Sequence, residues 1–167
     1  MIAKRLMINY LSIACCKNLT TRSNLIVNSF SKNDYKAACK KYLIDLQQTI
    51  CSEIELLDGG SVFEQDYWSR DDQRGNGVTC IISNGNVFEK GGVNFSIIRG
   101  DKMPKSATVN RPELEGRQYT ALGVSLVLHP DNPFIPTAHA NVRFFVAEEQ
   151  GKDPIWWFGG GLDLTPY

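Results

Sequence analysis

The last third of the chain is dominated by side chains that alternate between apolar and polar, and this period of two leaves few folds open. The alternation runs through "YTALGVSLVLHP", "HANVRFFVAE" and "IWWFGGGLDLTPY", residues 119–130, 139–148 and 155–167. Because successive side chains of a strand point to opposite faces, each segment predicts a strand with an apolar face and a more polar one. Such strands pair antiparallel and bury the apolar face against another layer.

One long helix supplies that layer. Residues 31–60, "SKNDYKAACKKYLIDLQQTICSEIELLDGG", carry apolar side chains at spacings of three and four, namely Tyr35, Cys39, Tyr42, Leu43, Leu46, Ile50, Ile54 and Leu57. Ser31 is the expected N-cap, with Asp34 three residues on, and Gly59-Gly60 ends the helix. The apolar face predicts core packing.

Between the helix and the last third, the sequence turns to β-rich segments. "VTCIIS" and "NVFEKGGVNFSIIRG" are separated at Asn84-Gly85, a dipeptide that predicts a tight hairpin because both residues tolerate positive φ. Residues 102–116 predict a polar, proline-containing loop. The whole pattern predicts an α+β fold with a mostly antiparallel sheet and a helix covering one face.

The distribution of charge sets residues 1–33 apart. Five of the 18 basic residues lie there without any acid, which leaves 13 basic against 18 acidic residues in the rest. An acidic body offers phosphates no broad positive surface, so we expect no nucleic-acid partner. The basic, Ser- and Thr-rich leader has the composition of an organellar transit peptide, with a disordered leader or a start codon placed too far upstream as alternatives. Its apolar stretch, "LMINYLSIACC", is too short and too polar for a transmembrane segment.

The cysteines argue against two further classes of protein. They number five and form no Cys-x-x-Cys pair, which fits a reducing compartment and not a secreted disulfide scaffold. No cysteine or histidine pair has zinc-finger spacing. No glycine-rich dinucleotide fingerprint follows a predicted strand.

Polar groups gather on one face of the predicted strands. The only two histidines, His129 and His139, flank one proline-rich loop, and pairing across it brings Ser125 and His129 beside His139, Asn141 and Arg143. Asp163 follows three glycines, Gly159 to Gly161, where a planar ligand can approach the backbone, and Trp156, Trp157 and Phe158 are expected as an apolar wall. Taken singly, each has a structural explanation: a polar loop residue, a solvated arginine, a turn aspartate or aromatic core. Together they predict a pocket in which Arg143 binds a carboxylate, the aromatic side chains pack against a flat ring, and an imidazole donates or accepts a proton.

Several motifs resemble those of the oxygen-dependent coproporphyrinogen III oxidase family of haem biosynthesis. They are "GVNFS", "MPKSAT", "RPELEGRQYTALGVSLVLHPDNPFIPTAHANVRFF" and "WWFGGGLDLTPY", and the likeness runs from about Tyr35 to Tyr167. "AHANVRFF" looks more like the bacterial form than the animal or plant form. The resemblance implies a homodimer of flat antiparallel sheets covered by helices, acting in the cytoplasm, or in mitochondria if residues 1–33 are a transit peptide.

The same resemblance implies a reaction and the residues that perform it. Two propionates of coproporphyrinogen III would be oxidatively decarboxylated to vinyl groups, with O2 as co-substrate and no organic cofactor, giving protoporphyrinogen IX. Ser125, Asn141, Val142 and Arg143 would contact substrate, and His139, Asp163 and Arg143 would be catalytic. His139 would donate a proton and Asp163 would engage the pyrrole nitrogens. His129 and His139 would be ligands of a divalent metal, Mn or Mg, as in bacterial members.

The family pattern continues well past "DLTPY", with two more proposed histidine ligands, a glycine-arginine substrate loop and dimer-forming segments. We therefore expect residues 34–167 to be the N-terminal part of the oxidase domain, a fragment that can lack activity on its own. Two other functions stay open. One is a non-catalytic tetrapyrrole-binding module, and the other is a metal-dependent oxygenase using His129, His139 and Asp163 as a facial triad.

Overall fold

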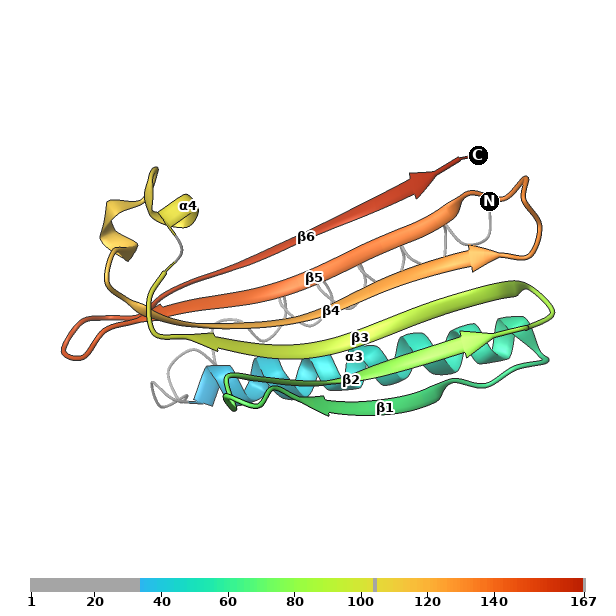
Figure 1. Ribbon diagram of the computed structural model, residues 1–167, viewed down its shortest axis with the longest axis horizontal. Coiled ribbons are helices and arrows are strands. Elements are labelled where there is room, and N and C mark those ends of the chain that lie inside the picture. The colour runs from blue at the N-terminus through green and yellow to red at the C-terminus, as the bar shows by residue number, and fades with distance from the viewer. Residues whose placement is uncertain (1–33, 104, 167) are drawn as a thin grey trace, which may run out of the picture. The chain divides into compact units, whose positions relative to one another are not determined.

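The computed structural model describes residues 34–103 and 105–166, which form one helix, one antiparallel sheet and two short helical turns (Figure 1). The sheet is a six-stranded meander in the order β1-β2-β3-β4-β5-β6. Its strands are β1 (Glu64–Ser69), β2 (Gly75–Ser83), β3 (Phe88–Gly100), β4 (Gln118–Pro130), β5 (Thr137–Glu148) and β6 (Ile155–Thr165). The predicted α+β class is confirmed. The leader and the expected N-cap Ser31 lie outside the described residues.

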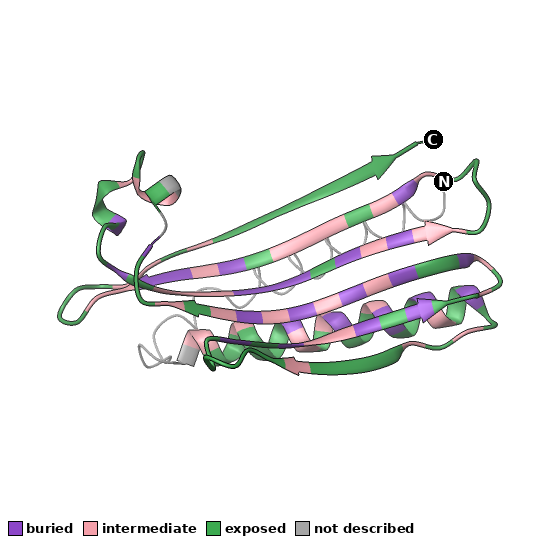
Figure 2. Ribbon diagram, in the orientation of Figure 1, coloured by how far each residue is buried: buried purple, intermediate pink, exposed green. Residues whose placement is uncertain are grey.

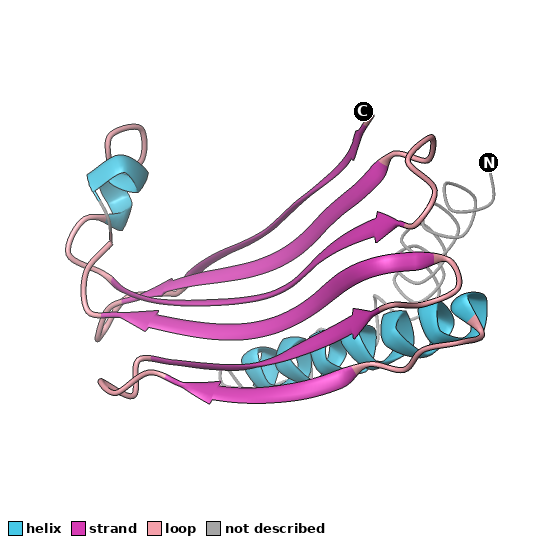
Figure 3. Cartoon of the chain, turned by 45° about the vertical axis from the view of Figure 1, so that its right-hand side comes forward, coloured by secondary structure: helices cyan, strands magenta, loops and turns pink. Residues whose placement is uncertain are grey.

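Helix α3 spans Asp34–Asp58, and from Cys39 onward it packs against the sheet along β1 to β3 (Figure 3). Its buried stripe is Leu43, Gln47, Cys51 and Ile54, at spacings of four, four and three. The predicted apolar face was too wide, because Tyr42 and Leu57 are exposed. The pattern also missed Gln47, whose Nε2 donates to the carbonyl oxygens of Val78 and Val93 at 2.9 and 2.8 Å.

The helix ends where the sequence predicted. Gly59 has a φ of 64°, a backbone conformation that glycine adopts without steric cost, and its N–H donates to the Glu55 carbonyl oxygen at 2.9 Å. The next strands begin after this turn, starting with β1, a segment that sequence patterning did not separate from its surroundings.

The apolar side chains of the central strands point to the face that α3 covers over β2 and β3. Along β3 to β5 they alternate with less buried positions, as the purple bands of Figure 2 show. The most buried members are Val93, Phe95, Ile97, Leu122, Val124, Phe144 and Val146. The opposite face of the same strands therefore remains available for polar groups.

The turn between β2 and β3 differs from the tight hairpin predicted at Asn84-Gly85. It spans residues 84–87, and only Asn84 has positive φ, at 55°. Gly85 is needed for a different reason, since a Cβ there would lie 2.2 Å from a carboxylate oxygen of Asp58. The buried Asp58 carboxylate accepts hydrogen bonds from the backbone N–H groups of Gly60, Ser61, Asn86, Val87 and Phe88, at 2.9–3.2 Å.

The segment predicted as a polar loop contains the two helical turns, α4 (Lys105–Thr108) and η1 (Pro112–Leu114). It is anchored by Met103 and Leu114, which are buried together with Ala147 of β5. Tyr119, Phe145 and Trp157 pack against this cluster. Two apolar residues among polar ones are too weak a signal to predict this anchoring.

Candidate functional site

The strand register aligns the predicted polar residues in rows across one face of the sheet. Ser125 on β4 pairs with Asn141 on β5, and His139 on β5 pairs with Asp163 on β6. Arg143 pairs with Gly123 on one side and Gly159 on the other. Since directly paired residues share a face, Ser125, His129, His139, Asn141, Arg143 and Asp163 lie on the same side of the sheet, which we call the site face.

His139 and Asp163 lie side by side on the site face, on the paired strands β5 and β6. The distance from His139 Nδ1 to Asp163 Oδ2 is 3.8 Å, and the two side chains are 46% and 71% exposed. The Thr165 hydroxyl donates to the same Oδ2 at 2.8 Å. An imidazole and a carboxylate held side by side and open to solvent can exchange protons with a ligand.

Arg143 is exposed between two glycines. A Cβ at Gly159 would meet nothing within 4 Å, so no side chain blocks the approach to Arg143 from β6. Among the residues that the structure describes, Arg143 has no salt-bridge partner, and its guanidinium is free to bind an external carboxylate.

Val142 is the one predicted substrate contact whose side chain leaves the site face. It pairs with Val124 and Gly160 on the opposite face. Its neighbours in the chain, Asn141 and Arg143, point the other way because the strand alternates. Contact between Val142 and a ligand on the site face would therefore involve its backbone.

An aromatic stack closes one end of the site face. Tyr119, Phe145 and Trp157 stack with ring centroids 5.2 and 4.5 Å apart, and the Arg111 guanidinium lies 4.6 Å from the centre of the Trp157 ring. The predicted apolar wall is thus wrong for Trp156 and Phe158, which alternate to the other face and contact Phe144 there. Arg111 was missed because the stack joins distant parts of the sequence.

A family model described as coproporphyrinogen III oxidase matches residues 38–167, which include every strand of the sheet and the whole site face. The chain belongs to the coproporphyrinogen III oxidase family. This membership indicates an oxidoreductase of porphyrin and haem biosynthesis, and it implies coproporphyrinogen III as the substrate.

His129 and His139, the expected metal ligands, lie on the site face without forming a ligand cluster. His129 Nδ1 lies 3.2 Å from the hydroxyl of the buried Thr137, and Val127, not His129, stands opposite His139. No group of three or more His, Cys, Asp or Glu side chains within residues 34–103 and 105–166 could hold a metal ion. The described donor set therefore does not fit a facial triad, and we assign no step to a metal.

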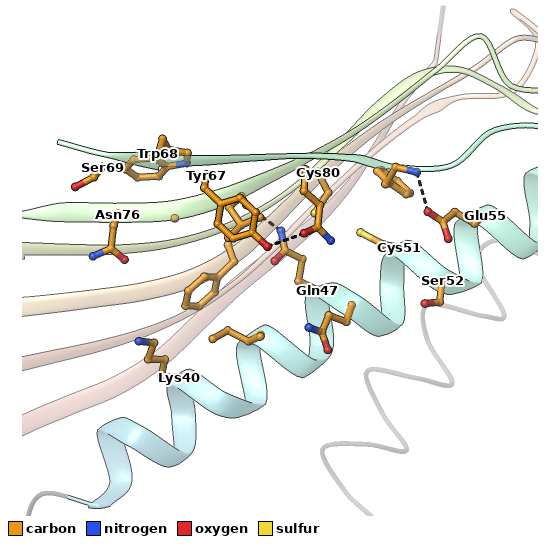
Figure 4. Close-up of a pocket in the computed structure, with 17 residues that line it drawn as sticks. Lys40, Gln47, Cys51, Ser52, Glu55, Tyr67, Trp68, Ser69, Asn76 and Cys80 are labelled. Carbon is orange, nitrogen blue, oxygen red and sulfur yellow. Dashed lines mark hydrogen bonds between the residues drawn. The ribbon is translucent and has the colours of Figure 1, made fainter.

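A cavity of about 600 Å³ lies on the other side of the sheet, between α3 and β1–β3. In Figure 4, Gln47 and Cys51 point from α3 toward the strands, facing Tyr67 and Cys80. Burial raises the pKa of the Cys51 and Cys80 thiols, so neither is a thiolate nucleophile at neutral pH. None of the predicted site residues lines this cavity, which makes the site face the better candidate for the family's chemistry.

Within residues 34–103 and 105–166, no helix combines the length and the apolar character that a bilayer crossing requires.

Proposed function

We propose that this protein catalyses the O2-dependent oxidative decarboxylation of two propionates of coproporphyrinogen III to vinyl groups, giving protoporphyrinogen IX. Each propionate loses CO2 and one hydride equivalent, and O2 accepts the electron pair. The observation that carries the proposal is the Arg143 guanidinium, which has no salt-bridge partner among the described residues and lies on the same open face as His139 and Asp163. A face that offers a cation, an imidazole and a carboxylate beside glycines suits a flat ligand with carboxylate substituents.

Each residue has a distinct part in the proposal. Arg143 binds the carboxylate of a propionate, with Ser125 and Asn141 as neighbouring hydrogen-bonding groups. His139 donates a proton, and its position beside Asp163, at 3.8 Å, leaves the Nε2 edge of the imidazole for the ligand. Asp163 accepts hydrogen bonds from pyrrole N–H groups.

The test is turnover of coproporphyrinogen III by the full-length protein, followed by the appearance of protoporphyrinogen IX after its oxidation to the fluorescent porphyrin. We expect product in air without added flavin or nicotinamide, and none under strict anaerobiosis. His139→Ala should lower kcat more than it weakens substrate binding. Product formation without O2, or only with an added nucleotide, would contradict the proposal.

The exposure of the site face favours a second candidate, a tetrapyrrole-binding protein without catalysis. The side chains of His139 and Asp163 are 46% and 71% exposed, so the described residues do not exclude water from the groups that would perform the chemistry. This candidate predicts tight binding of the tetrapyrrole without consumption of oxygen, which an oxygen electrode distinguishes from turnover.

A further inference from the structure

Thr165, the last residue of β6, lies beside the acidic group of the site face. It stands two residues from Asp163 on the same strand, and its strand partner on β5 is Thr137. Residues two apart on a strand share a face, so the Thr165 hydroxyl can reach the Asp163 carboxylate. Its Oγ1 donates to Asp163 Oδ2 at 2.8 Å. The two side chains therefore act as a unit at the end of β6.

The contacts of the Asp163 carboxylate distinguish its two oxygens. His139 Nδ1, at 3.8 Å, approaches the same Oδ2 that accepts from Thr165. Within residues 34–103 and 105–166, no group donates a hydrogen bond to Oδ1. The Asp163 side chain is exposed, and each carboxylate oxygen can accept hydrogen bonds. Oδ1 is therefore the oxygen that is open to a ligand.

The backbone holds the Thr165 hydroxyl in place. Thr165 pairs with Thr137 on one side, and Pro166 follows it in the chain. A residue before proline is restricted to extended conformations, and a β-branched side chain has few χ1 rotamers. The terminal torsion of an aspartate is soft, so an exposed carboxylate without such a partner rotates. The hydrogen bond from Thr165 restricts this rotation of Asp163.

We propose that Thr165 is a positioning residue, which holds Asp163 Oδ2 so that Oδ1 accepts a hydrogen bond from a pyrrole N–H. This inference rests on the proposed function and adds to it the orientation of the Asp163 carboxylate. Thr165 acts through Asp163 and does not itself contact the substrate. A fixed acceptor favours binding, because less conformational freedom is lost when the ligand arrives.

Thr165→Val tests the proposal, because valine keeps the shape of threonine and removes the hydroxyl. In the full-length protein we expect the Kd for coproporphyrinogen III, measured anaerobically by tryptophan fluorescence, to rise about three- to tenfold. KM should rise similarly, with a smaller change in kcat. Thr165→Ser restores the hydroxyl and should return Kd to near the wild-type value. The melting temperature should not change in either variant, because Thr165 and Asp163 are exposed.

A double-mutant cycle with Asp163→Ala shows whether Thr165 acts through Asp163. In the Asp163→Ala protein, Thr165→Val should cause no further rise in Kd, since the carboxylate that Thr165 orients is gone. Thr49→Val is the matched control. The hydroxyl of this exposed threonine also donates at 2.8 Å, to the Asp45 carbonyl oxygen within α3, so its loss should leave Kd unchanged.

An unchanged Kd in Thr165→Val, with wild-type binding intact, would overturn the role of Thr165 and leave the proposed function standing. A rise in Kd that persists in the Asp163→Ala background, or that Thr165→Ser does not reverse, would overturn it as well. Absence of binding by the wild-type protein would contradict the proposed function itself, and this inference with it.

Discussion

Arg143 is the residue whose geometry makes the sharpest kinetic prediction. It is exposed, flanked by Gly123 and Gly159, and has no salt-bridge partner in the described part of the chain. A hydrogen bond to a charged group contributes about 1.5–3 kcal/mol, so Arg143→Ala should lower kcat/KM about 10- to 100-fold. Arg143→Lys keeps the charge but loses the planar, bidentate guanidinium, so its kcat/KM should lie between those of the wild type and Arg143→Ala. Steady-state kinetics on variants with wild-type circular dichroism provide the measurement.

The control for Arg143 is Arg99→Ala, which removes an exposed arginine from the opposite face of β3 and should leave kinetics unchanged. Wild-type kinetics in Arg143→Ala would show that the site face does not bind the substrate carboxylate.

Asp58 gives a prediction about stability and pH. Burial raises the pKa of this carboxyl, but hydrogen bonds from the backbone N–H groups of Val87, Phe88, Asn86 and Ser61 outweigh burial and hold the pKa at about 2. A folded-state pKa below the unfolded value of about 3.9 stabilises the fold above that pH, and the contribution is lost as pH falls toward 2. Asp58→Asn should lower the free energy of unfolding at pH 7 by about 2–4 kcal/mol.

The measurement for Asp58 is urea unfolding between pH 7 and pH 2. The difference between the wild type and Asp58→Asn should shrink as the pH falls from about 4 to about 2. Asp72→Asn changes an exposed carboxyl that accepts one backbone N–H and should have a small effect. A difference that is constant with pH would mean that the charge of Asp58 is unimportant.

Among the elements, α3 is held to the sheet by a polar contact inside an apolar stripe. The Gln47 amide bonds to carbonyl oxygens of both β2 and β3, and its side chain is buried. Gln47→Met keeps the length but leaves both carbonyls without this donor, and should lower the free energy of unfolding by about 1–3 kcal/mol. Chemical denaturation measures this difference, and Gln48→Met, at an exposed position of the same helix, is the control. An unchanged free energy of unfolding in Gln47→Met would show that the Gln47 hydrogen bonds do not stabilise the packing of α3 on the sheet.

The elements that sequence could predict are those with a strong local period. The helix at residues 34–58 and the faces of β4 and β5 follow from spacings of 3.6 and two, and these faces also placed His139, Asn141 and Arg143 together. The position of Asn94 opposite Ser125 could not be found this way, because it depends on the register of β3 against β4, which no local pattern encodes. The prediction of the β2–β3 turn was wrong for a related reason. The backbone N–H groups of Val87 and Phe88 donate to the Asp58 carboxylate, which belongs to α3.

At the scale of the whole molecule, β6 is the last strand of the sheet that the structure describes, and it has an exposed apolar face. Trp156 and Phe158 are 54% and 57% exposed, and Leu162 and Leu164 continue the same face toward the end of the strand. We call these four residues the β6 stripe. It lies on the side opposite the site face. Among the described strands β6 pairs only with β5, which leaves its other edge open to association. A long apolar edge of this kind favours association with another surface.

We therefore expect the 167-residue chain to associate with itself in a concentration-dependent manner. Sedimentation velocity should show species heavier than the monomer, and the double substitution Leu162→Lys with Leu164→Lys should shift the distribution toward the monomer, because charges on an edge strand oppose pairing. Ligand binding should be unaffected by these changes, since the β6 stripe faces away from Arg143 and His139. Lysine substitutions at Tyr67 and Val62, exposed positions near the other edge of the sheet, serve as the control. A wild-type chain that stays monomeric and unfolds in one cooperative transition would show that the β6 stripe is stable in water without a partner.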